Sequence, residues 1–337
     1  MALDLSLYRA LNFYPRGQDY TGPAIAHNCN MPWTSLSVNL EGRCFVCGCD
    51  AHLPIPVGYI TDFDKLDDVW TNPTARELQQ TITDKKFTYC AVDHCGIKTQ
   101  DILTQYYYIS VNIDESCNLA CPSCRRSLIN HTSGPIFDTR KAQVDHFVNL
   151  INKFEKPLYL TMTGNGDPLA SLIMRPLVLN WVPKSNQTIQ LFTNGLLMRK
   201  LLPESTIFPY ISDFKISVDA GSEDVYEVVR RPGKYSVLRD NLDWLASNRG
   251  LNTQVRLMFT LSALNALDIV NFAEMCNNYN FNGEITKLDN WNTFDNFEEN
   301  NVVDNIDHPL HAKALEQLRL VSTMPYITLA PTIKNLL

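Results

Sequence analysis

The chain has 337 residues, of which 45% are hydrophobic, and its formal net charge at pH 7 is −7. This is enough apolar sequence for a large core, in one large domain or in one large and one small domain. The negative charge argues against a nucleic-acid-binding protein, which would carry a basic surface. Because the N-terminus lacks a basic start and no run of about 18 apolar residues occurs, we expect no signal peptide, no membrane span and a cytoplasmic location.

The strands and helices expected from the sequence divide the chain near residue 100. Residues 1–100 are predicted to form a small cysteine-rich domain with one helix near 74–82, and 101–337 a second domain. From about residue 104, helical patterns over 139–154, 222–229 and 266–279 fall between candidate strands. The strands are predicted over 106–114, 157–164, 187–195, 213–221, 254–262 and 283–289. This alternation predicts an α/β fold with a parallel sheet, a partial (β/α)6 TIM-like barrel preceded by the cysteine-rich domain.

The predicted strands alternate between apolar and polar residues, whereas buried parallel strands are usually apolar throughout. In 213–221, for example, Phe214 and Ile216 oppose Lys215 and Ser217. We expect the apolar faces to meet the helices and the polar faces to line an open barrel that holds a polar ligand. A sheet with one solvated face is the alternative, but it fits poorly with a helix after every strand. Arg256 would lie on the polar face, where it needs an anionic partner such as Asp219 or a bound carboxylate.

Ten cysteines are distributed unevenly along the chain. Disulfides rarely persist in a reducing cytosol, so clustered cysteines predict metal or redox chemistry. Cys276 stands alone on an apolar helical face and is expected to be a buried small hydrophobe. The others form a group before residue 100 and a triplet after the first predicted strand: Cys29, Cys44, Cys47, Cys49, Cys90 and Cys95, then Cys117, Cys121 and Cys124.

The triplet has the spacing C-x-x-x-C-x-x-C and follows a strand directly, at the end of a barrel strand where such folds keep their chemistry. A cubane iron–sulfur cluster usually has four thiolate ligands, so three would leave one iron open to chelate a substrate and deliver an electron to it. The alternative is a zinc site with a distant fourth ligand such as His131. Zinc sites more often show paired C-x-x-C elements.

The motif CNLACPSC is similar to the signature of the radical S-adenosylmethionine superfamily, and residues 104–290 resemble that family. The resemblance implies that Cys117, Cys121 and Cys124 hold a 4Fe–4S cluster whose open iron binds the amino and carboxylate groups of S-adenosylmethionine. One electron would break the S–C5′ bond to give methionine and a 5′-deoxyadenosyl radical, which abstracts a substrate hydrogen. The family usually has an aromatic residue before the third cysteine, packed on the adenine, where this chain has Ser123.

Further motifs resemble the family's cofactor contacts. TGNGDPL is similar to the glycine-rich motif that contacts the methionine amino group, LFTNG to the turn after the third strand, and SVDAG to the fourth strand, which faces the ribose and carboxylate. In VVRRPGKY, Arg230 or Arg231 could pair with the methionine carboxylate or instead interact with a helix dipole. The expected cofactor-binding residues are Gly164, Asn165, Gly166, Asp167, Asn194, Ser217, Asp219, Arg230 and Arg256.

The N-terminal cysteines lie in a stretch that resembles a SPASM-type auxiliary cluster domain, although that module normally follows a radical domain. The resemblance implies one auxiliary 4Fe–4S cluster held by Cys29, Cys47, Cys90 and Cys95, with Cys44 and Cys49 as surplus thiols. Zinc is the alternative, since cysteine-rich ribbons bind it well. A second auxiliary centre would need an open iron or a ligand such as His52 or His94.

Many proteins that pair these two modules modify ribosomally made peptides. The resemblance therefore implies an enzyme that crosslinks, epimerises or splices a precursor peptide. The expected partners are S-adenosylmethionine, the precursor peptide, a small leader-binding protein, and a flavodoxin or ferredoxin as electron donor. The alternatives are a small-molecule radical dehydrogenase or epimerase and a non-enzymatic zinc-binding protein. The triplet after a strand and the polar strand faces count against the last of these.

Overall fold

The computed structural model describes residues 19–26, 28–47, 53–92, 95, 105–162 and 165–337. The chain divides into two compact units. The first unit comprises Met1–Asp114, Thr132–Asn165 and Trp181–Ile189, and the second comprises Glu115–His131, Gly166–Asn180 and Gln190–Leu337. The predicted domain boundary near residue 100 falls among residues outside the description and stays a prediction. Within the described ranges, every helix is too short or too polar to cross a membrane.

Among its described residues, the first unit contains five strands and the start of a sixth, in the order β6-β5-β4-β1-β2-β3. Strand β4 runs parallel to both of its neighbours, β1 and β5, whereas β2 is antiparallel to β1 and β3. The cysteine-rich segment therefore adds its strands directly to the sheet of the first predicted β/α unit. The strands are β1 (Ser35–Val38), β2 (Arg43–Phe45), β3 (Gly58–Tyr59), β4 (Tyr107–Val111), β5 (Leu158–Met162) and β6 (Gln187–Thr193).

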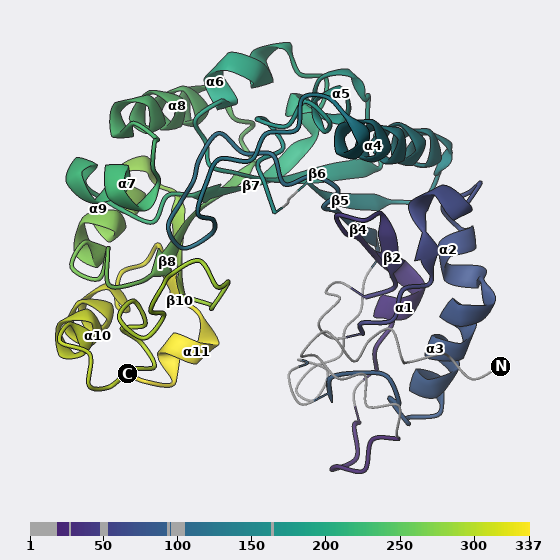
Figure 1. Cartoon of the computed structure of the whole chain (residues 1–337), viewed down its shortest axis with the longest axis horizontal. Helices are drawn as coiled ribbons and strands as arrows, with labels where there is room; N and C mark the ends of the chain where they lie inside the picture. The colour runs from purple at the N-terminus through teal and green to yellow at the C-terminus, as the bar shows by residue number, and fades with distance from the viewer. Residues whose placement is uncertain (1–18, 27, 48–52, 93–94, 96–104, 163–164) are drawn as a thin grey trace. The chain divides into compact units, whose positions relative to one another are not determined.

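Helices cover this part of the sheet and tie the cysteine-rich segment to it (Figure 1). The Trp70 indole donates to Ser35 O over 2.8 Å, and its ring lies 4.9 Å from that of Tyr107. Gln143 donates to Glu41 O over 3.0 Å, and a Cβ at Gly42, where φ is +78°, would lie 2.4 Å from the Gln143 amide. The helical segments are α1 (Met31–Thr34), η2 (Ile60–Asp62), α2 (Asp68–Thr71), α3 (Pro73–Thr83) and α4 (Pro135–Lys153).

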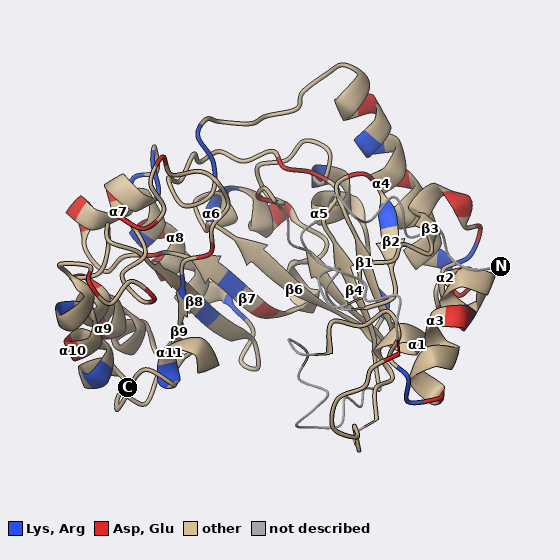
Figure 2. Cartoon of the chain, turned by 60° about the horizontal axis from the view of Figure 1, so that its bottom comes forward, with Lys and Arg blue, Asp and Glu red and all other residues tan. Residues whose placement is uncertain are grey.

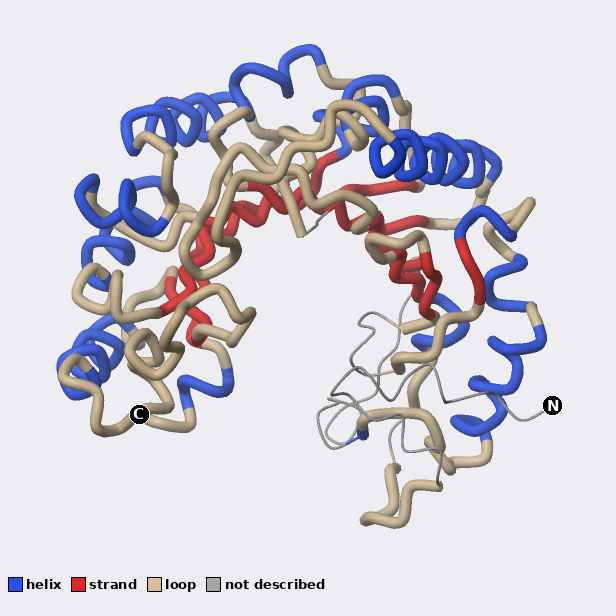
Figure 3. The backbone as a smooth tube through the Cα atoms, in the orientation of Figure 1, coloured by secondary structure: helices blue, strands red, loops and turns tan. Residues whose placement is uncertain are grey.

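The second unit continues β6 and has the strand order β10-β9-β8-β7-β6. The strands β7 (Ile211–Ser217), β8 (Gln254–Leu261), β9 (Asn282–Lys287) and β10 (Ile327–Leu329) run parallel to one another. Helices α7 to α10 lie on one side of β7, β8 and β9 (Figure 3). The helical segments are α5 (Arg175–Asn180), α6 (Met198–Leu201), η5 (Leu202–Glu204), η6 (Phe208–Tyr210), α7 (Glu223–Val229), α8 (Tyr235–Asn248), α9 (Ile269–Tyr279), α10 (His311–Val321) and α11 (Pro331–Lys334).

The alternation of strand faces is present as predicted. Ile216 and Leu257 are fully buried, whereas Lys215 and Arg256, which face each other across β7 and β8, are only partly buried. Figure 2 shows the resulting charged bands on β7 and β8. Burial of the apolar faces, at about 25 cal/mol per Å², drives the packing of helices on one side and leaves polar groups on the other. Cys276 is buried on α9, as expected.

The mixed α/β class and the six predicted strands are confirmed, whereas their closure into a partial TIM-like barrel stays a prediction. The predicted strands overrun the observed ones mostly at their C-terminal ends. Residues 218–221, for example, lie beyond β7. Val218 and Ala220 are nevertheless fully buried. The alternation of buried residues thus continues beyond the last strand residue, Ser217, which explains why the sequence predicts a longer strand. Ser222 occupies the N-cap of α7, but its side chain makes no capping hydrogen bond.

Candidate active site

The cysteine triplet lies on a loop of the second unit that follows β4. The loop is closed at its base by a hydrogen bond from Cys117 N to Ile129 O over 2.9 Å. Within it, the amides of Cys124 and Arg125 both donate to Cys121 O, at 2.9 and 3.0 Å, and form a tight turn. Cys121 is buried, Cys117 is half-buried and Cys124 is exposed. The loop thus offers three thiols of graded exposure, with the outermost one open to solvent.

A reciprocal contact fixes the residue before Cys121. Ala120 N donates to Arg231 O over 2.7 Å, and Arg231 Nε donates back to Ala120 O over 2.9 Å. Arg231 was one of two candidates for the methionine carboxylate. Its Nε is instead used to hold the cysteine loop, so the structure gives this residue a positioning role.

The glycine-rich stretch after β5 packs on the start of the same loop. Asp167 N donates to Ser116 O over 2.9 Å, and a Cβ built on Gly166 would lie 2.3 Å from that oxygen. Glycine is therefore required here for the approach of two backbones. The sequence had suggested an approach to a ligand instead. Asn165 N donates to Asn112 Oδ1 over 2.9 Å in the first unit, and Gly164 lies outside the described residues.

The carboxylate of Asp167 is buried and already accepts four hydrogen bonds. Oδ1 accepts from the amides of Leu169 and Ala170 at 2.9 and 3.3 Å. Oδ2 accepts from Thr193 Oγ1 and Asn194 N at 2.8 and 2.6 Å. Burial raises the pKa of Asp167, and these donors oppose that shift. A carboxylate can accept about four hydrogen bonds, so the Asp167 carboxylate has no acceptor position left for the expected ammonium group. These hydrogen bonds join this loop to the end of β6.

Asn194, at the end of β6, faces the first cysteine. Its Nδ2 donates to Asn118 Oδ1 over 2.8 Å and approaches Cys117 Sγ at 3.8 Å. The Leu119 amide also donates to Cys117 Sγ over 3.4 Å. Burial, with a smaller contribution from the Asp167 carboxylate, raises the pKa of Cys117 to about 11. This thiol is therefore neutral at pH 7 unless a metal stabilises the thiolate.

A buried ion pair lies against the second cysteine. Arg230, 8% exposed, places Nη1 at 3.5 Å from Cys121 Sγ and 3.2 Å from Asp219 Oδ2, and Nη2 donates to Ser217 O over 2.5 Å. Asp219 has a φ of +58°, and its Oδ1 accepts from Thr260 N over 2.7 Å. Burial acts to lower the pKa of Arg230, but Cys121 and Asp219 outweigh it and raise the pKa, so the guanidinium stays charged. An interaction of Arg230 with the helix dipole alone would not account for its contact with a cysteine sulfur.

Arg256 has a different partner from those expected. It forms a bidentate contact with Asp213 on β7, with Nε 3.3 Å from Oδ1, and a longer one of 4.0 Å to Glu284. Asp219 is held by Arg230 and Thr260. Arg256 lies on the polar strand face, as predicted, but its charge is balanced within the sheet, several residues before the C-terminal ends of the strands.

The candidate fourth ligand for a zinc site at the cysteine triplet has another partner. His131, the candidate fourth zinc ligand, pairs with Glu115 at 3.1 Å. Throughout the described ranges, no three Cys, His, Asp or Glu side chains converge tightly enough for a single ion. Thiolates around zinc lie only about 3.8 Å apart. N–H donors to cysteine sulfurs tune a bound iron–sulfur cluster, and donors of this kind reach both Cys117 and Cys121.

The four predicted auxiliary ligands lie near one another in the first unit. Burial raises the pKa of Cys90 most, and interactions with Cys47, Cys29 and Cys95 raise it further, which places the three thiols within electrostatic range. Cys29 and Cys90 pack against a small core that contains Phe87 and Val92. Cys44 is buried on β2, where burial and then Asp62 raise its pKa, so it stands apart from this group. Cys49, His52 and His94 lie outside the described residues.

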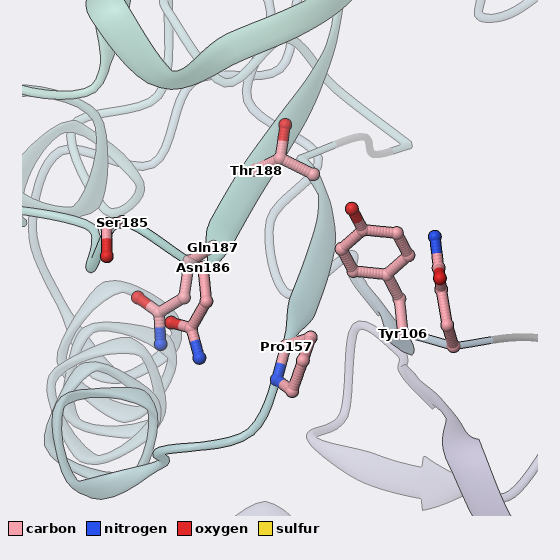
Figure 4. Close-up of a pocket in the computed structure, with 7 residues that line it drawn as sticks. Tyr106, Pro157, Ser185, Asn186, Gln187 and Thr188 are labelled. Carbon is pink, nitrogen blue, oxygen red and sulfur yellow. The ribbon is translucent and has the colours of Figure 1, made fainter.

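A hollow of about 280 Å³ in the first unit lies where β4, β5 and β6 begin. Figure 4 shows Tyr106, Pro157 and Thr188 around it, with Ser185, Asn186 and Gln187. Parallel strands carry their chemistry at the opposite, C-terminal ends. No cysteine lines this hollow, and we do not assign it to the candidate site.

The sequence patterns missed several residues around the triplet. Asn118 and Arg125 lie inside or beside the cysteine motif, and Arg125 donates to Glu115 O over 2.7 Å. Thr193 lies inside the LFTNG motif and Tyr226 lies two residues before VVRRPGKY, but only the folded chain shows that Thr193 donates to Asp167 and that Tyr226 lies near Arg230. Nothing in the sequence marks them beyond that proximity.

Residues 29–96 match the SPASM family, an iron–sulfur cluster-binding domain. Comparison with curated protein sequences finds no match. Solved structures that resemble this chain distantly include TYW1 with a lysine-pyruvate adduct bound, at 15% identity over 66% of this chain and 72% of that chain, with a TM-score of 0.39. Streptococcus suis SuiB bound to precursor peptide SuiA has 12% identity over 81% and 68%, with a TM-score of 0.41. A spore photoproduct lyase mutant with dinucleoside spore photoproduct has 8% identity over 77% and 95%, with a TM-score of 0.38. Likenesses this distant carry no functional argument.

Proposed function

We propose that this chain is a radical S-adenosylmethionine enzyme whose reactive cluster is held by Cys117, Cys121 and Cys124. The observation that carries the proposal is the loop geometry. Three thiols follow one strand, N–H donors reach two of their sulfurs, and a buried guanidinium lies 3.5 Å from Cys121 Sγ. When bound, the 4Fe–4S cluster would supply the electron that cleaves S-adenosylmethionine to methionine and a 5′-deoxyadenosyl radical.

The chain's own residues would orient the cofactors and balance their charge. The three cysteines bind iron as thiolates, which lose their protons when metal binds. Arg230 and the Leu119 amide offset the negative charge on the sulfurs. Asp167 holds the start of the cysteine loop and Arg231 holds the residue before Cys121, so the thiols are positioned before metal binds. Ser217, with Asp219 and Asn194, would face the remaining cofactor at the C-terminal ends of β6 and β7.

The auxiliary centre is proposed at Cys29, Cys47, Cys90 and Cys95, as one 4Fe–4S cluster with all four ligands from the protein. The match of residues 29–96 to an iron–sulfur domain family supports it, as does the proximity of the four thiols. A fully ligated cluster has no open iron, so this centre would transfer electrons or stabilise its part of the fold and would not bind S-adenosylmethionine.

For the substrate we propose a ribosomally made precursor peptide, with a separate leader-binding protein and a flavodoxin or ferredoxin as electron donor. Two aromatic side chains on the polar face of β4 and β5 support a peptide. The Tyr108 ring lies 5.2 Å from that of Tyr159, and Tyr108 is 37% exposed. An exposed tyrosine can pack its ring against apolar side chains of a peptide and form hydrogen bonds through its hydroxyl. A small-molecule dehydrogenase or epimerase has no comparable support.

The test of the reaction is the production of 5′-deoxyadenosine by anaerobically reconstituted, reduced protein. We expect the wild type to release it from S-adenosylmethionine, and the Cys117→Ala/Cys121→Ala/Cys124→Ala variant to release none. Ser127→Ala, a change at an exposed position of the same loop, should retain the wild-type rate. Cleavage by the triple variant would refute the assignment, and zinc in place of iron and sulfide in the wild type would favour the binding-protein alternative.

A further inference from the structure

Tyr226 is a fully buried tyrosine next to the cysteine loop, and nothing in the proposed reaction yet uses it. It lies on α7, and its side chain has no solvent exposure. Its hydroxyl has no hydrogen-bond partner within the described part of the chain. A buried hydroxyl without a partner costs free energy that phenylalanine would avoid while filling nearly the same space. The hydroxyl therefore points to a partner that the protein alone does not supply.

Arg230, which contacts a cysteine sulfur, is the nearest candidate to act with it. The two residues are four positions apart at the end of α7 and share one helix face, with Arg230 N donating to Tyr226 O over 2.8 Å. Arg230 Nε is a second buried polar atom without a partner among the described residues. Burial raises the pKa of Tyr226, and the charges of Arg230, Cys121 and Asp219 also act on it, so the phenol lies within electrostatic range of all three.

The acceptors around the phenol are unequally occupied. Asp219 Oδ1 accepts from Thr260 N and Oδ2 pairs with Arg230. Cys121 Sγ accepts one hydrogen bond, from Arg230 Nη1, within the described ranges. A cysteine thiolate bound to iron keeps acceptor capacity for N–H and O–H donors. The sulfur of Cys121 is therefore the acceptor with room for the phenol proton once it is bound to iron.

We propose that Tyr226 is a positioning residue that tunes the reduction potential of the cluster held by Cys117, Cys121 and Cys124. When Cys121 binds iron as a thiolate, the Tyr226 O–H would donate to its sulfur, a contact that is not made in this structure. Donors to a cluster sulfur stabilise the reduced, more negative cluster and raise its potential. The inference rests on the proposed function, since it needs the cluster to be present.

The experiment is an EPR-monitored redox titration of the full-length, reconstituted protein. The relevant cluster is identified as the one whose signal changes when S-adenosylmethionine is added, because only an open iron binds it. In Tyr226→Phe we expect the ratio of reduced to oxidised cluster at a fixed solution potential to fall about tenfold, a shift of about 59 mV for one electron. The metal-free variant should melt at or above the wild-type temperature.

Tyr235→Phe is the matched control. Its ring lies 5.6 Å from that of Tyr226, but its hydroxyl donates to Gly221 O over 2.6 Å. We expect its titration to match the wild type.

A second variant replaces Tyr226 with 3-fluorotyrosine, a stronger hydrogen-bond donor of similar size. It should shift the ratio of reduced to oxidised cluster in the opposite direction, and it tests the proposal even if the phenylalanine variant folds poorly.

The outcomes separate this inference from the function on which it rests. If the wild type has no cluster signal that responds to S-adenosylmethionine, both fail. If the wild type responds but the Tyr226→Phe ratio is unchanged, or shifts as much as that of Tyr235→Phe, only the tuning role fails. A lower melting temperature without a potential shift would give Tyr226 a structural role instead.

Discussion

Asp167 is the residue that joins three parts of the candidate site. Its carboxylate receives four donors from its own loop and from the end of β6, and its amide donates to the start of the cysteine loop. Hydrogen bonds to a buried carboxylate stabilise the fold more than hydrogen bonds between neutral groups, because water cannot solvate the buried charge. The stability of this region therefore depends on one charged group.

Asp167→Asn should be strongly destabilising, because in either orientation the amide places N–H donors where at least one backbone N–H group already points. We expect a loss of about 2–4 kcal/mol in the free energy of unfolding, measured by chemical denaturation of the metal-free protein. Asp240→Asn, the same change at an exposed position on α8, should change it by less than about 0.5 kcal/mol. Equal effects of the two changes would show that the four hydrogen bonds do not carry the stability assigned to them.

Gly166→Ala should displace the cysteine loop, because its new Cβ would meet Ser116 O at 2.3 Å. A backbone oxygen cannot rotate away as a flexible side chain can. We expect a cost of about 1–3 kcal/mol and a lower yield of bound iron after reconstitution. Gly250→Ala, where the nearest atom is a side-chain oxygen at 3.1 Å, serves as the control. Wild-type iron content in Gly166→Ala would contradict the role given to this close approach.

At the scale of elements, the joining of β1 to β4 is the main departure from the sequence-based picture. The strands pair in parallel, with Leu36 opposite Ile109, although 73 positions separate them along the chain. Leu36 is fully buried at this junction. The cysteine-rich segment therefore shares its core with β4 and α4, and we expect it to be required for the stability of the first unit.

Leu36→Ala tests that junction. Loss of this buried side chain should cost about 2–5 kcal/mol, seen as a lower denaturant midpoint, and removal of residues 1–104 should leave an exposed β4 edge that promotes aggregation. Leu251→Ala, at a fully exposed position, provides the baseline. A soluble, monomeric truncated chain with native circular dichroism would mean that the segment folds separately.

The sequence patterns predicted the six central strands because alternating side chains and following helices are local signals. Ile109, Phe214 and Leu257 are buried as their periodicity indicated. The short strands β1 to β3 were missed, since runs of two to four residues carry little periodicity and their pairing is decided by distant contacts. The cysteines of the triplet were recognisable from their spacing. Their supports were not, because contacts such as those between Arg231 and Ala120 form only in the folded chain.

At the scale of the whole molecule, the account requires two metal centres, one in each compact unit. They use separate cysteines, so each should survive loss of the other. The Cys117→Ala/Cys121→Ala/Cys124→Ala variant should retain about four of about eight irons, held by Cys29, Cys47, Cys90 and Cys95. Iron analysis with sulfide determination checks this. An iron count near zero would remove the auxiliary cluster from the account and leave the triplet site standing.

The central claim is that an iron held by the triplet binds S-adenosylmethionine directly. Electron–nuclear double resonance on the reduced protein, with S-adenosylmethionine labelled with ¹⁵N at its amino group, measures that contact. We predict a ¹⁵N coupling to the cluster in the wild type and none in the triple variant, whose remaining cluster has no open iron. A wild-type protein with its full iron content and no ¹⁵N coupling would contradict the claim.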